Sequence, residues 1–293
     1  MRQVIVQVVQ HLAPGGIECM VLDLLKHATA EQQVYVVSLE GTAAQLQQWP
    51  RLQPYSERLL FLDKQSGWQP RLVWRLRQLL VSLQADVVHT HHIGPLLYGG
   101  LAARLAGVTR RLHTEHDAWH LHSRKRRWLA NQALRWVQPL LVVDSQLVSH
   151  TLRQLLPGHN PLVVLNGVDA QRFTPGPKTI ARQHLGLPET VRLIGCAARL
   201  QEVKGHTTLL DALLRLPVDV HLALAGSGPL LAQLQQQTAD LGLLQRVHFL
   251  GHVEAMVDFY RALDVFCLAS FAEGMPLSLL EAQACGVPVV ATQ

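Results

Sequence analysis

Short runs rich in β-branched residues alternate with longer segments of helical period along the 293 residues of the chain. This alternation is typical of repeated β-α units, which build a parallel sheet with helices on its faces. The first unit begins with the run Val4 to Val9, continues through Gly15-Gly16, and then has apolar residues at helical spacing from Met20 to Leu25. The sequence therefore predicts an α/β fold.

The predicted strands fall into two series. Turn-forming residues gather at Asn166 to Asp169 and at Thr174 to Pro177, where neither regular element is favoured. We expect two Rossmann-like doubly wound parallel-sheet domains that face each other across a cleft, with residues 1–172 in the first and 173–293 in the second. Since the last run, Pro288 to Gln293, has no helix after it, the second domain is expected to be incomplete at its C-terminus. The strands are predicted at Val4 to Val9, Val34 to Leu39, Arg58 to Leu62, Asp86 to Thr90, Arg110 to Thr114, Leu140 to Val143, Leu162 to Leu165, Val191 to Ala197, Val220 to Ala225, Arg246 to Leu250, Val265 to Leu268 and Val287 to Ala291.

The composition excludes several classes of protein. Hydrophobic residues make up 48% and charged residues 16%, which is too apolar for a disordered chain and indicates a globular one. No stretch holds about 18 uninterrupted apolar residues, so no transmembrane helix is expected, and the first residues lack the features of a signal peptide. The 4 cysteines are far apart and form no Cys-x-x-Cys pair, which favours a reducing, cytosolic setting over disulfides or structural zinc.

Two cations follow the predicted strand Val191 to Ala197. Arg199 comes just after this strand, and Lys204-Gly205 stands at the start of the next predicted helix. Cations at a loop and a helix N-terminus suit a diphosphate, whose charge they would neutralise as a leaving group. Two solvated surface charges are the alternative. A second tight turn, Gly226 to Pro229, is predicted at the same carboxyl edge, where ligands of open parallel sheets bind.

Glycines and acids mark two further candidate positions. Gly15 and Gly16 would let a ligand approach the backbone at the start of a helix, although a plain tight turn also explains them. Glu273 and Glu281 lie eight positions apart, with Glu273 in a loop and Glu281 inside the helix that Pro276 begins. Carboxylates suit the hydroxyls of a sugar or ribose because each accepts directional hydrogen bonds. Two unrelated surface glutamates are the alternative.

In their order along the chain, these residues resemble the retaining group-1 glycosyltransferases (family 4 type) with the GT-B fold. The ordered combination is far more specific than any single motif, and it covers nearly the whole chain. The segments that carry the resemblance are Asn166-Gly167-Val168-Asp169, Ala198-Arg199-Leu200, Lys204-Gly205, Gly226-Ser227-Gly228-Pro229, Val247-His248-Phe249-Leu250-Gly251, and Glu273-Gly274-Met275-Pro276 through Glu281.

The resemblance implies a nucleoside diphosphate sugar donor bound by the second domain and an acceptor site in the first. Arg199 and Lys204 would hold the diphosphate, Glu281 the ribose, and Glu273 with the following backbone the sugar. His116 matches the family's active-site histidine, which orients and polarises the transferred sugar. The implied catalytic residues are His116, Glu273, Arg199 and Lys204, and the implied donor-binding residues are Gly15, Gly16, Arg199, Lys204, Gly226, Gly228, Glu273, Gly274, Met275, Pro276 and Glu281.

Seven histidines crowded into 34 residues raise the alternative of a metal site. They fall on different predicted strands and loops, without the spacing of a metal motif, and the sequence has no Asp-x-Asp. The resemblance also implies transfer without a metal or a cofactor, with the nucleotide sugar as co-substrate. We therefore predict no metal site. The seven residues are His89, His91, His92, His113, His116, His120 and His122.

Much of the net charge of +5 lies in one run, Arg124-Lys125-Arg126-Arg127, on a predicted helix that also carries Trp128. A basic amphipathic helix of this kind could contact anionic lipid headgroups and bring a lipid-linked acceptor to the protein. A solvated helix face is the alternative. Nucleic-acid binding is not expected because no recognition motif accompanies the charge.

The prediction is a cytoplasmic hexosyltransferase, peripheral to the inner membrane face. It would move a sugar from a nucleoside diphosphate sugar to a hydroxyl of a glycan or glycolipid, with retention, in bacterial surface polysaccharide synthesis. Two alternatives stay open. An epimerase of the same fold would need acid-base groups at the sugar, and a non-catalytic nucleotide-sugar binding protein would bind the donor without turnover.

Overall fold

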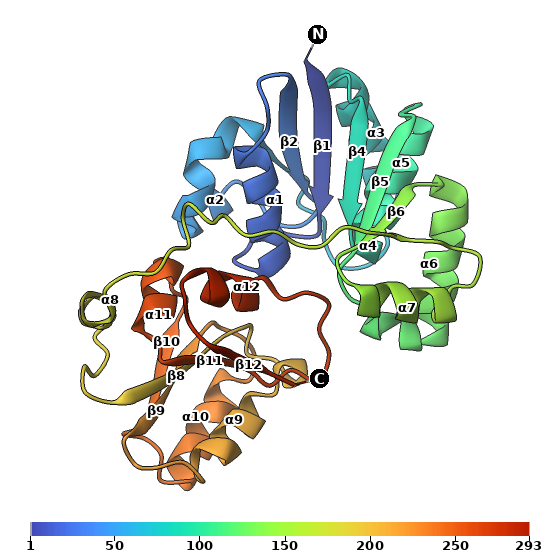
Figure 1. Cartoon of the computed structure of the whole chain (residues 1–293). Coiled ribbons are helices and arrows are strands. Elements are labelled where there is room, and N and C mark those ends of the chain that lie inside the picture. Colours follow the sequence, from blue (N-terminus) through green and yellow to red (C-terminus); the bar gives the residue numbers. More distant parts are fainter. Residues whose placement is uncertain (1, 293) are drawn as a thin grey trace. The chain divides into compact units, whose positions relative to one another are not determined.

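The computed structural model describes residues 2–292 and divides into two compact units, Met1–Asn166 and Gly167–Gln293 (Figure 1). Each unit is a parallel sheet with helices on both faces, which confirms the expected doubly wound α/β fold. The domain boundary placed between residues 172 and 173 stays a prediction.

Seven parallel strands form the first sheet, and alternate residues of its first strand serve opposite faces. Val6 and Val8 belong to the core between the sheet and the helices on one face, and Val9 belongs to the core between the sheet and the helices on the other face. The two-residue period of a strand thus buries both faces of the sheet. In the spatial order β3-β2-β1-β4-β5-β6-β7, the strands are β1 (Gln3–Val9), β2 (Gln32–Ser38), β3 (Leu59–Phe61), β4 (Val87–His91), β5 (Arg110–Glu115), β6 (Leu140–Val143) and β7 (Leu162–Val163).

The helices of this unit differ from the prediction at one segment. A single helix is expected from Leu96 to Ala106, but a π-helical turn, Leu96–Gly100, interrupts it. Gly99 and Gly100 pack tightly there, since a Cβ on either would lie 3.0 Å from a valine side chain. The helices are α1 (Gly16–Lys26), α2 (Gln45–Gln48), α3 (Pro70–Ser82), α4 (Ile93–Pro95), α5 (Leu101–Leu105), α6 (Arg124–Val137) and α7 (Gln146–Leu155), with 3₁₀ helices at Pro50–Arg58 and Trp119–His122.

The second unit has a smaller sheet of five parallel strands in the order β10-β9-β8-β11-β12. Its strands are β8 (Arg192–Ala197), β9 (Val220–Ala225), β10 (Val247–Gly251), β11 (Val265–Leu268) and β12 (Val289–Ala291). Its helices are α8 (Lys178–His184), α9 (His206–Leu213), α10 (Leu231–Asp240), α11 (Met256–Ala262) and α12 (Leu277–Ala284), with a 3₁₀ helix at Glu202–Lys204. Across residues 2–292, no helix combines the length and the apolar character that crossing a bilayer requires.

The two sheets repeat one connection pattern, in which the third, second and first strands of the unit are followed by its fourth and fifth. Successive strands are added toward one edge of the sheet up to β3 in the first unit and β10 in the second, and toward the other edge after that. The strand order therefore reverses between β1 and β4 in the first unit, and between β8 and β11 in the second. In open parallel sheets, ligands bind beyond the carboxyl ends of the strands at such a reversal. The loops that follow these four strands are therefore where each unit should carry its chemistry.

Candidate functional site

In the second unit, backbone hydrogen bonds join the loops at the carboxyl ends of β8, β9 and β11. The Leu200 amide donates to the Ser227 carbonyl at 2.9 Å, which ties the loop after β8 to the loop after β9. The Phe271 amide donates to the Val203 carbonyl at 2.8 Å, which ties the loop after β11 to the 3₁₀ helix before α9. Apart from Gly15 and Gly16 in the first unit, the residues predicted to bind a donor stand on these connected loops and on α12, the helix that follows β11.

Three glycines allow the loops to approach so closely. Gly205 has a left-handed φ of +64°, and a Cβ on it would lie 1.9 Å from the Ala269 carbonyl oxygen. A Cβ on Gly226 or Gly228 would lie 2.1 Å or 2.4 Å from a carbonyl oxygen of the loop after β8. Backbone packing therefore explains why these positions are glycine. The donor contacts expected of Gly226 and Gly228 stay predictions.

This packing brings Lys204 and Glu273 into contact. Lys204 Nζ lies 2.7 Å from Glu273 Oε1, and Ser270 Oγ donates to the same oxygen at 2.6 Å. The two charged side chains are 24% and 23% exposed, so solvent reaches the pair. Within residues 2–292, Oε1 carries the hydrogen bonds of Glu273 and Oε2 has no partner. The carboxylate is thus fixed through one oxygen and available through the other.

Glu281 and Arg199 are held differently. Glu281 lies in α12, and the hydroxyl of the fully buried Tyr260 donates to its Oε2 at 2.6 Å. The Arg199 side chain is exposed, and its guanidinium forms no hydrogen bond or ion pair with the rest of residues 2–292. The turn from Gly274 to Pro276 leads into α12, with Pro276 at the N-cap. The convergence of Arg199, Lys204, Glu273 and Glu281 on one pocket stays a prediction.

In the first unit, Gly15 and Gly16 connect β1 to α1. Gly15 is the N-cap of α1 in an extended conformation, and Gly16 is its first residue. A Cβ on Gly16 would meet no atom within 4 Å, so packing inside the unit does not require glycine there. The open backbone is compatible with the close ligand approach that the sequence predicts.

A chain of buried side chains runs through the reversal point between β1 and β4. His91 Nε2 lies 2.9 Å from Gln7 Oε1, and His91 Nδ1 lies 3.1 Å from His116 Nε2. His116 Nδ1 lies 3.4 Å from Asp144 Oδ2. Each of the four residues is less than a tenth exposed. Both ring nitrogens of His116 therefore have a protein partner, which limits the orientations of its ring.

The charge state of His91 suits this arrangement. Burial, and then the neighbouring imidazoles, lower the pKa of His91 well below its ordinary value. The same causes lower the pKa of His89 to about 3. His91 is neutral at physiological pH and has one donor and one acceptor nitrogen. It therefore links Gln7 to His116 as an uncharged hydrogen-bonding group.

His92 carries the positive charge of this region. Its φ of +67° and ψ of 169° lie in a region that residues other than glycine rarely adopt, at a cost of about 1–3 kcal/mol. Burial lowers the pKa of His92, but the hydrogen bond to Glu115 at 2.9 Å and the charge of that carboxylate outweigh burial and raise the pKa to about 9. Burial raises the pKa of Glu115, but hydrogen bonds from His113 and His92 hold it well below its ordinary value. Backbone strain and an ion pair with the buried Glu115 together mark His92 as a candidate functional position.

The clustered histidines contact one another rather than surround a common point. The ring centroids of His89 and His91 are 4.1 Å apart, and those of His91 and His116 are 5.4 Å apart. In the described part of the chain, no group of three or more His, Cys, Asp or Glu side chains is placed to hold a metal ion.

Sequence reasoning missed the partners that position the predicted residues. Ser270 and Tyr260 hold the two glutamates, and Gln7, His91 and Asp144 complete the chain around His116. His91 was noticed only as a member of the histidine cluster. No local sequence pattern signals this contact, because it depends on the parallel pairing of β4 with β5, in which His91 lies opposite Thr114.

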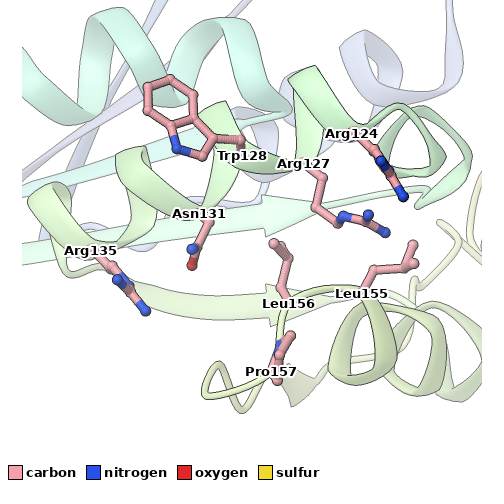
Figure 2. Close-up of a pocket in the computed structure, with 8 residues that line it drawn as sticks. All are labelled: Arg124, Arg127, Trp128, Asn131, Arg135, Leu155, Leu156 and Pro157. Carbon is pink, nitrogen blue, oxygen red and sulfur yellow. The ribbon is translucent and has the colours of Figure 1, made fainter.

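The basic helix α6 borders a groove of about 280 Å³ (Figure 2). The sequence predicts a helix from Lys125 to Val137, and α6 begins one residue earlier, at Arg124, and ends at Val137. The groove is lined by Arg124, Arg127, Trp128, Asn131 and Arg135 from α6, and by Leu155, Leu156 and Pro157 at and beyond the end of α7.

Two family models match the chain, one over each unit. Residues 14–172 match the family described as Glycosyltransferase Family 4, and residues 177–293 match the family described as Glycosyl transferases group 1. Between them, the matches include every residue proposed above for donor binding and catalysis.

Known proteins resemble the chain in sequence and in structure. The D-inositol 3-phosphate glycosyltransferase of Corynebacterium jeikeium is 32% identical over 254 residues, which are 80% of this chain and 54% of that protein. The lipopolysaccharide core biosynthesis mannosyltransferase LpsB of Rhizobium meliloti is 41% identical over 139 residues, which are 44% of this chain and 40% of that protein. The chain thus spans about half the length, or less, of these curated relatives.

A solved structure resembles the chain in its fold. HepE of Anabaena, in complex with UDP-glucose, superposes with a TM-score of 0.85 at 26% identity, over 99% of this chain and 80% of that chain. Both units of this chain, with their parallel sheets of seven and five strands, therefore have counterparts in a GT-B structure. The family models and the shared architecture agree, and the chain belongs to the group-1, family 4 glycosyltransferases with the GT-B fold.

Proposed function

We propose that the protein transfers a hexosyl unit from a nucleoside diphosphate sugar to a hydroxyl of a glycan or lipid-linked acceptor, with retention of the anomeric configuration. The observation that carries the proposal is the contact of Lys204 with Glu273 beyond the carboxyl ends of β8 and β11. This edge is where an open parallel sheet binds its ligand. The UDP-glucose complex of HepE, a structural neighbour, supports a nucleotide sugar as that ligand.

The donor-side roles follow from the chemistry of the second unit. Lys204 and the exposed Arg199 supply cations for the diphosphate, and they stabilise the charge that develops on the leaving group. Glu273 offers Oε2 to a sugar hydroxyl while Lys204 and Ser270 hold its other oxygen. Glu281, fixed by Tyr260, accepts from the ribose hydroxyls. Cationic side chains at the diphosphate make a bridging metal unnecessary in this scheme.

The first unit supplies the acceptor side. His116 contacts and polarises the transferred sugar, and His91 and Asp144 keep its ring in one orientation. Gly15 and Gly16 leave a length of open backbone for the donor phosphates and the acceptor. His116 is placed here as an orienting group, since front-face attack assisted by the leaving phosphate requires no separate general base.

The relatives support a lipid-linked or surface-glycan acceptor. One is named for lipopolysaccharide core synthesis, and a further relative in Corynebacterium glutamicum is named as a mannosyltransferase that acts on a monoacylated phosphatidylinositol monomannoside. We therefore place the protein in bacterial surface glycan or glycolipid synthesis, at the cytoplasmic face of the membrane.

A donor panel with product analysis tests the proposal. The protein is incubated with UDP-glucose, other UDP-hexoses and GDP-mannose, and free sugar, transferred sugar and altered donor are measured separately. Hydrolysis or transfer that Lys204→Ala abolishes while the fold is intact supports the proposal. An epimerised donor, or donor binding without turnover, would replace it with the epimerase or the binding protein. The anomeric configuration of the first product, read by NMR, tests retention.

A further inference from the structure

His92 and Asp117 lie close together beyond the carboxyl ends of β4 and β5 without a hydrogen bond between them. His92 Nε2 is 3.8 Å from Asp117 Oδ2, which is longer than a hydrogen bond. Neither of these two atoms has a hydrogen-bond partner elsewhere in residues 2–292. The His92 and Asp117 side chains are 29% and 26% exposed, so solvent reaches both. A nitrogen and a carboxylate oxygen thus lie at a separation that one ligand oxygen could bridge.

A buried partner holds the other polar atom of each side chain. His92 Nδ1 lies 2.9 Å from Glu115 Oε1, and Glu115 is 3% exposed. Asp117 Oδ1 lies 3.2 Å from Nδ1 of His120, which is 7% exposed. These two contacts fix the His92 ring and the Asp117 carboxylate, because each is anchored to a group that cannot move into solvent. The two remaining polar atoms are therefore presented in a defined arrangement.

Two further features of this cluster point to a ligand with polar and apolar parts. His120 Nε2 is buried, lies 3.9 Å from Glu115 Oε2, and has no hydrogen bond within the described residues. A buried nitrogen is costly to leave without a hydrogen bond, so a polar ligand that completes the cluster would be favourable. Trp119 is 51% exposed, and its ring lies edge-on to His120 with centroids 6.3 Å apart. Its indole offers the carbon atoms of a sugar ring an apolar surface.

The charges around His92 are mostly negative. Burial lowers the pKa of His92, but the hydrogen bond to Glu115 and the charge of that carboxylate outweigh burial. The charges of Asp117 and Glu18 also raise this pKa. Three carboxylates therefore act on one imidazolium. His11, which lies 3.2 Å from Glu18, offsets at most the weakest of the three when it is protonated. An arriving anion would meet more negative than positive charge.

We propose that His92 and Asp117 together bind one hydroxyl of an uncharged sugar acceptor, and that the surrounding carboxylates exclude a phosphorylated acceptor. The inference rests on the proposed glycosyl transfer and specifies its acceptor class. A hydroxyl accepts from His92 Nε2 and donates to Asp117 Oδ2, so it satisfies both atoms at once. A phosphate near neutral pH carries close to two negative charges and has little proton to donate to Asp117. The ring centroids of His92 and His116 are 5.4 Å apart, so the acceptor would lie beside the residue proposed to contact the transferred sugar.

Histidine NMR at pH 7.5 tests the acceptor class with matched ligands. Methyl α-mannoside, methyl α-glucoside and myo-inositol are each titrated beside their phosphate monoesters, and the His92 resonance, assigned by its loss in His92→Gln, reports binding. We expect the neutral compounds that shift this resonance to bind roughly tenfold more tightly than their monoesters. Asp117→Asn removes a repelling charge and should raise the affinity for the monoesters roughly tenfold. Glu57→Gln removes the same charge from an exposed residue that has no ion pair in the described chain, and should not.

Three results would overturn the proposal. The first is a phosphate monoester that binds as tightly as its neutral partner. The second is an Asp117→Asn protein whose affinity for the monoesters rises no more than that of Glu57→Gln. The third is a His92 resonance that none of the compounds shifts. Thermal unfolding checks the fold of each variant. Donor hydrolysis without acceptor, measured on the same samples, tests the proposed transfer separately, since binding at His92 does not depend on turnover.

Discussion

Lys204 Nζ and Glu273 Oε1 are 2.7 Å apart although 69 residues separate them in the chain. The contact joins the loop after β8 to the loop after β11, so a cation suited to a diphosphate and a carboxylate suited to a sugar fix each other's position. A lysine ammonium has three donors and can bind a phosphate oxygen while it keeps Glu273. The pair can therefore hold the two parts of a nucleotide sugar in one relative orientation.

Removal of the lysine charge should nearly abolish turnover. We expect Lys204→Ala to lower kcat/KM for the donor by about 10²–10³, the usual effect of losing one group that stabilises a developing negative charge. Arg215→Ala removes an exposed cation outside the site and should leave kcat/KM unchanged. Steady-state donor hydrolysis measures both, and a Lys204→Ala enzyme as active as the Arg215→Ala enzyme would contradict the donor role.

The close approach at Gly205 can be tested separately from its backbone angle. Gly205 and Gly242 have similar φ values, +64° and +69°, but a Cβ would clash with the Ala269 carbonyl only at Gly205. Gly242→Ala should cost about 1 kcal/mol of unfolding free energy for the left-handed backbone. Gly205→Ala should cost about 1–3 kcal/mol more because the loops must separate. Denaturant unfolding measures the difference, and equal costs would show that the loop contact adds nothing.

The two hydrogen bonds of His91 can be removed one at a time. The amide of asparagine can take the place of Nδ1 and that of glutamine the place of Nε2. His91→Asn therefore keeps the contact to His116, and His91→Gln keeps the contact to Gln7. We expect kcat to fall about 10²-fold in His91→Gln, with donor KM unchanged, because a misplaced His116 costs about that much, and to fall much less in His91→Asn. Equal kcat values would mean that His91 does not position His116.

The His92–Glu115 pair predicts a specific dependence on pH. The pKa of His92 is raised from 6.5 to about 9 in the folded protein, so its stabilisation is fully present below pH 6.5 and is lost as the pH rises toward 9. In Glu115→Gln, burial still lowers the pKa of His92, and only the more distant carboxylates raise it. The pKa of His92 should therefore fall well below 9. Asp117→Asn, which removes the 3.8 Å contact, should change it less. Histidine NMR titration measures both variants, and a His92 that titrates near 6.5 in the unmodified protein would refute the ion pair.

Sequence patterns predicted elements and loops better than contacts. Apolar runs indicate which segments form strands such as β1 and β8, because a strand buried in a parallel sheet is apolar on both faces. Glycine-containing turns indicate the loops that follow these strands. The π-helical turn at Leu96–Gly100 was not predictable because it depends on the fit of Gly99 against the sheet and of Gly100 against Val137 of α6. Helical periodicity alone does not contain that information.

In the candidate site too, the sequence indicates individual residues better than the contacts between them. Motif spacing identified Lys204 and Glu273, but not Ser270, whose hydroxyl lies beside Glu273 only because of the local turn. Gln7 and Asp144 have no local pattern, since their relation to His116 arises from the pairing of β1, β4, β5 and β6. Partners that come from distant strands require the register of the sheet, which one sequence does not supply.

The same strand order has a kinetic consequence for the protein. Gln7 and His91 are 84 residues apart, and Lys204 and Glu273 are 69 apart. Neither set of contacts can form before its two distant strands become neighbours, and such long-range pairing is slow. Recovered turnover in a refolding experiment should therefore lag behind helix formation, and enzymatic activity would itself report when the sheets have closed.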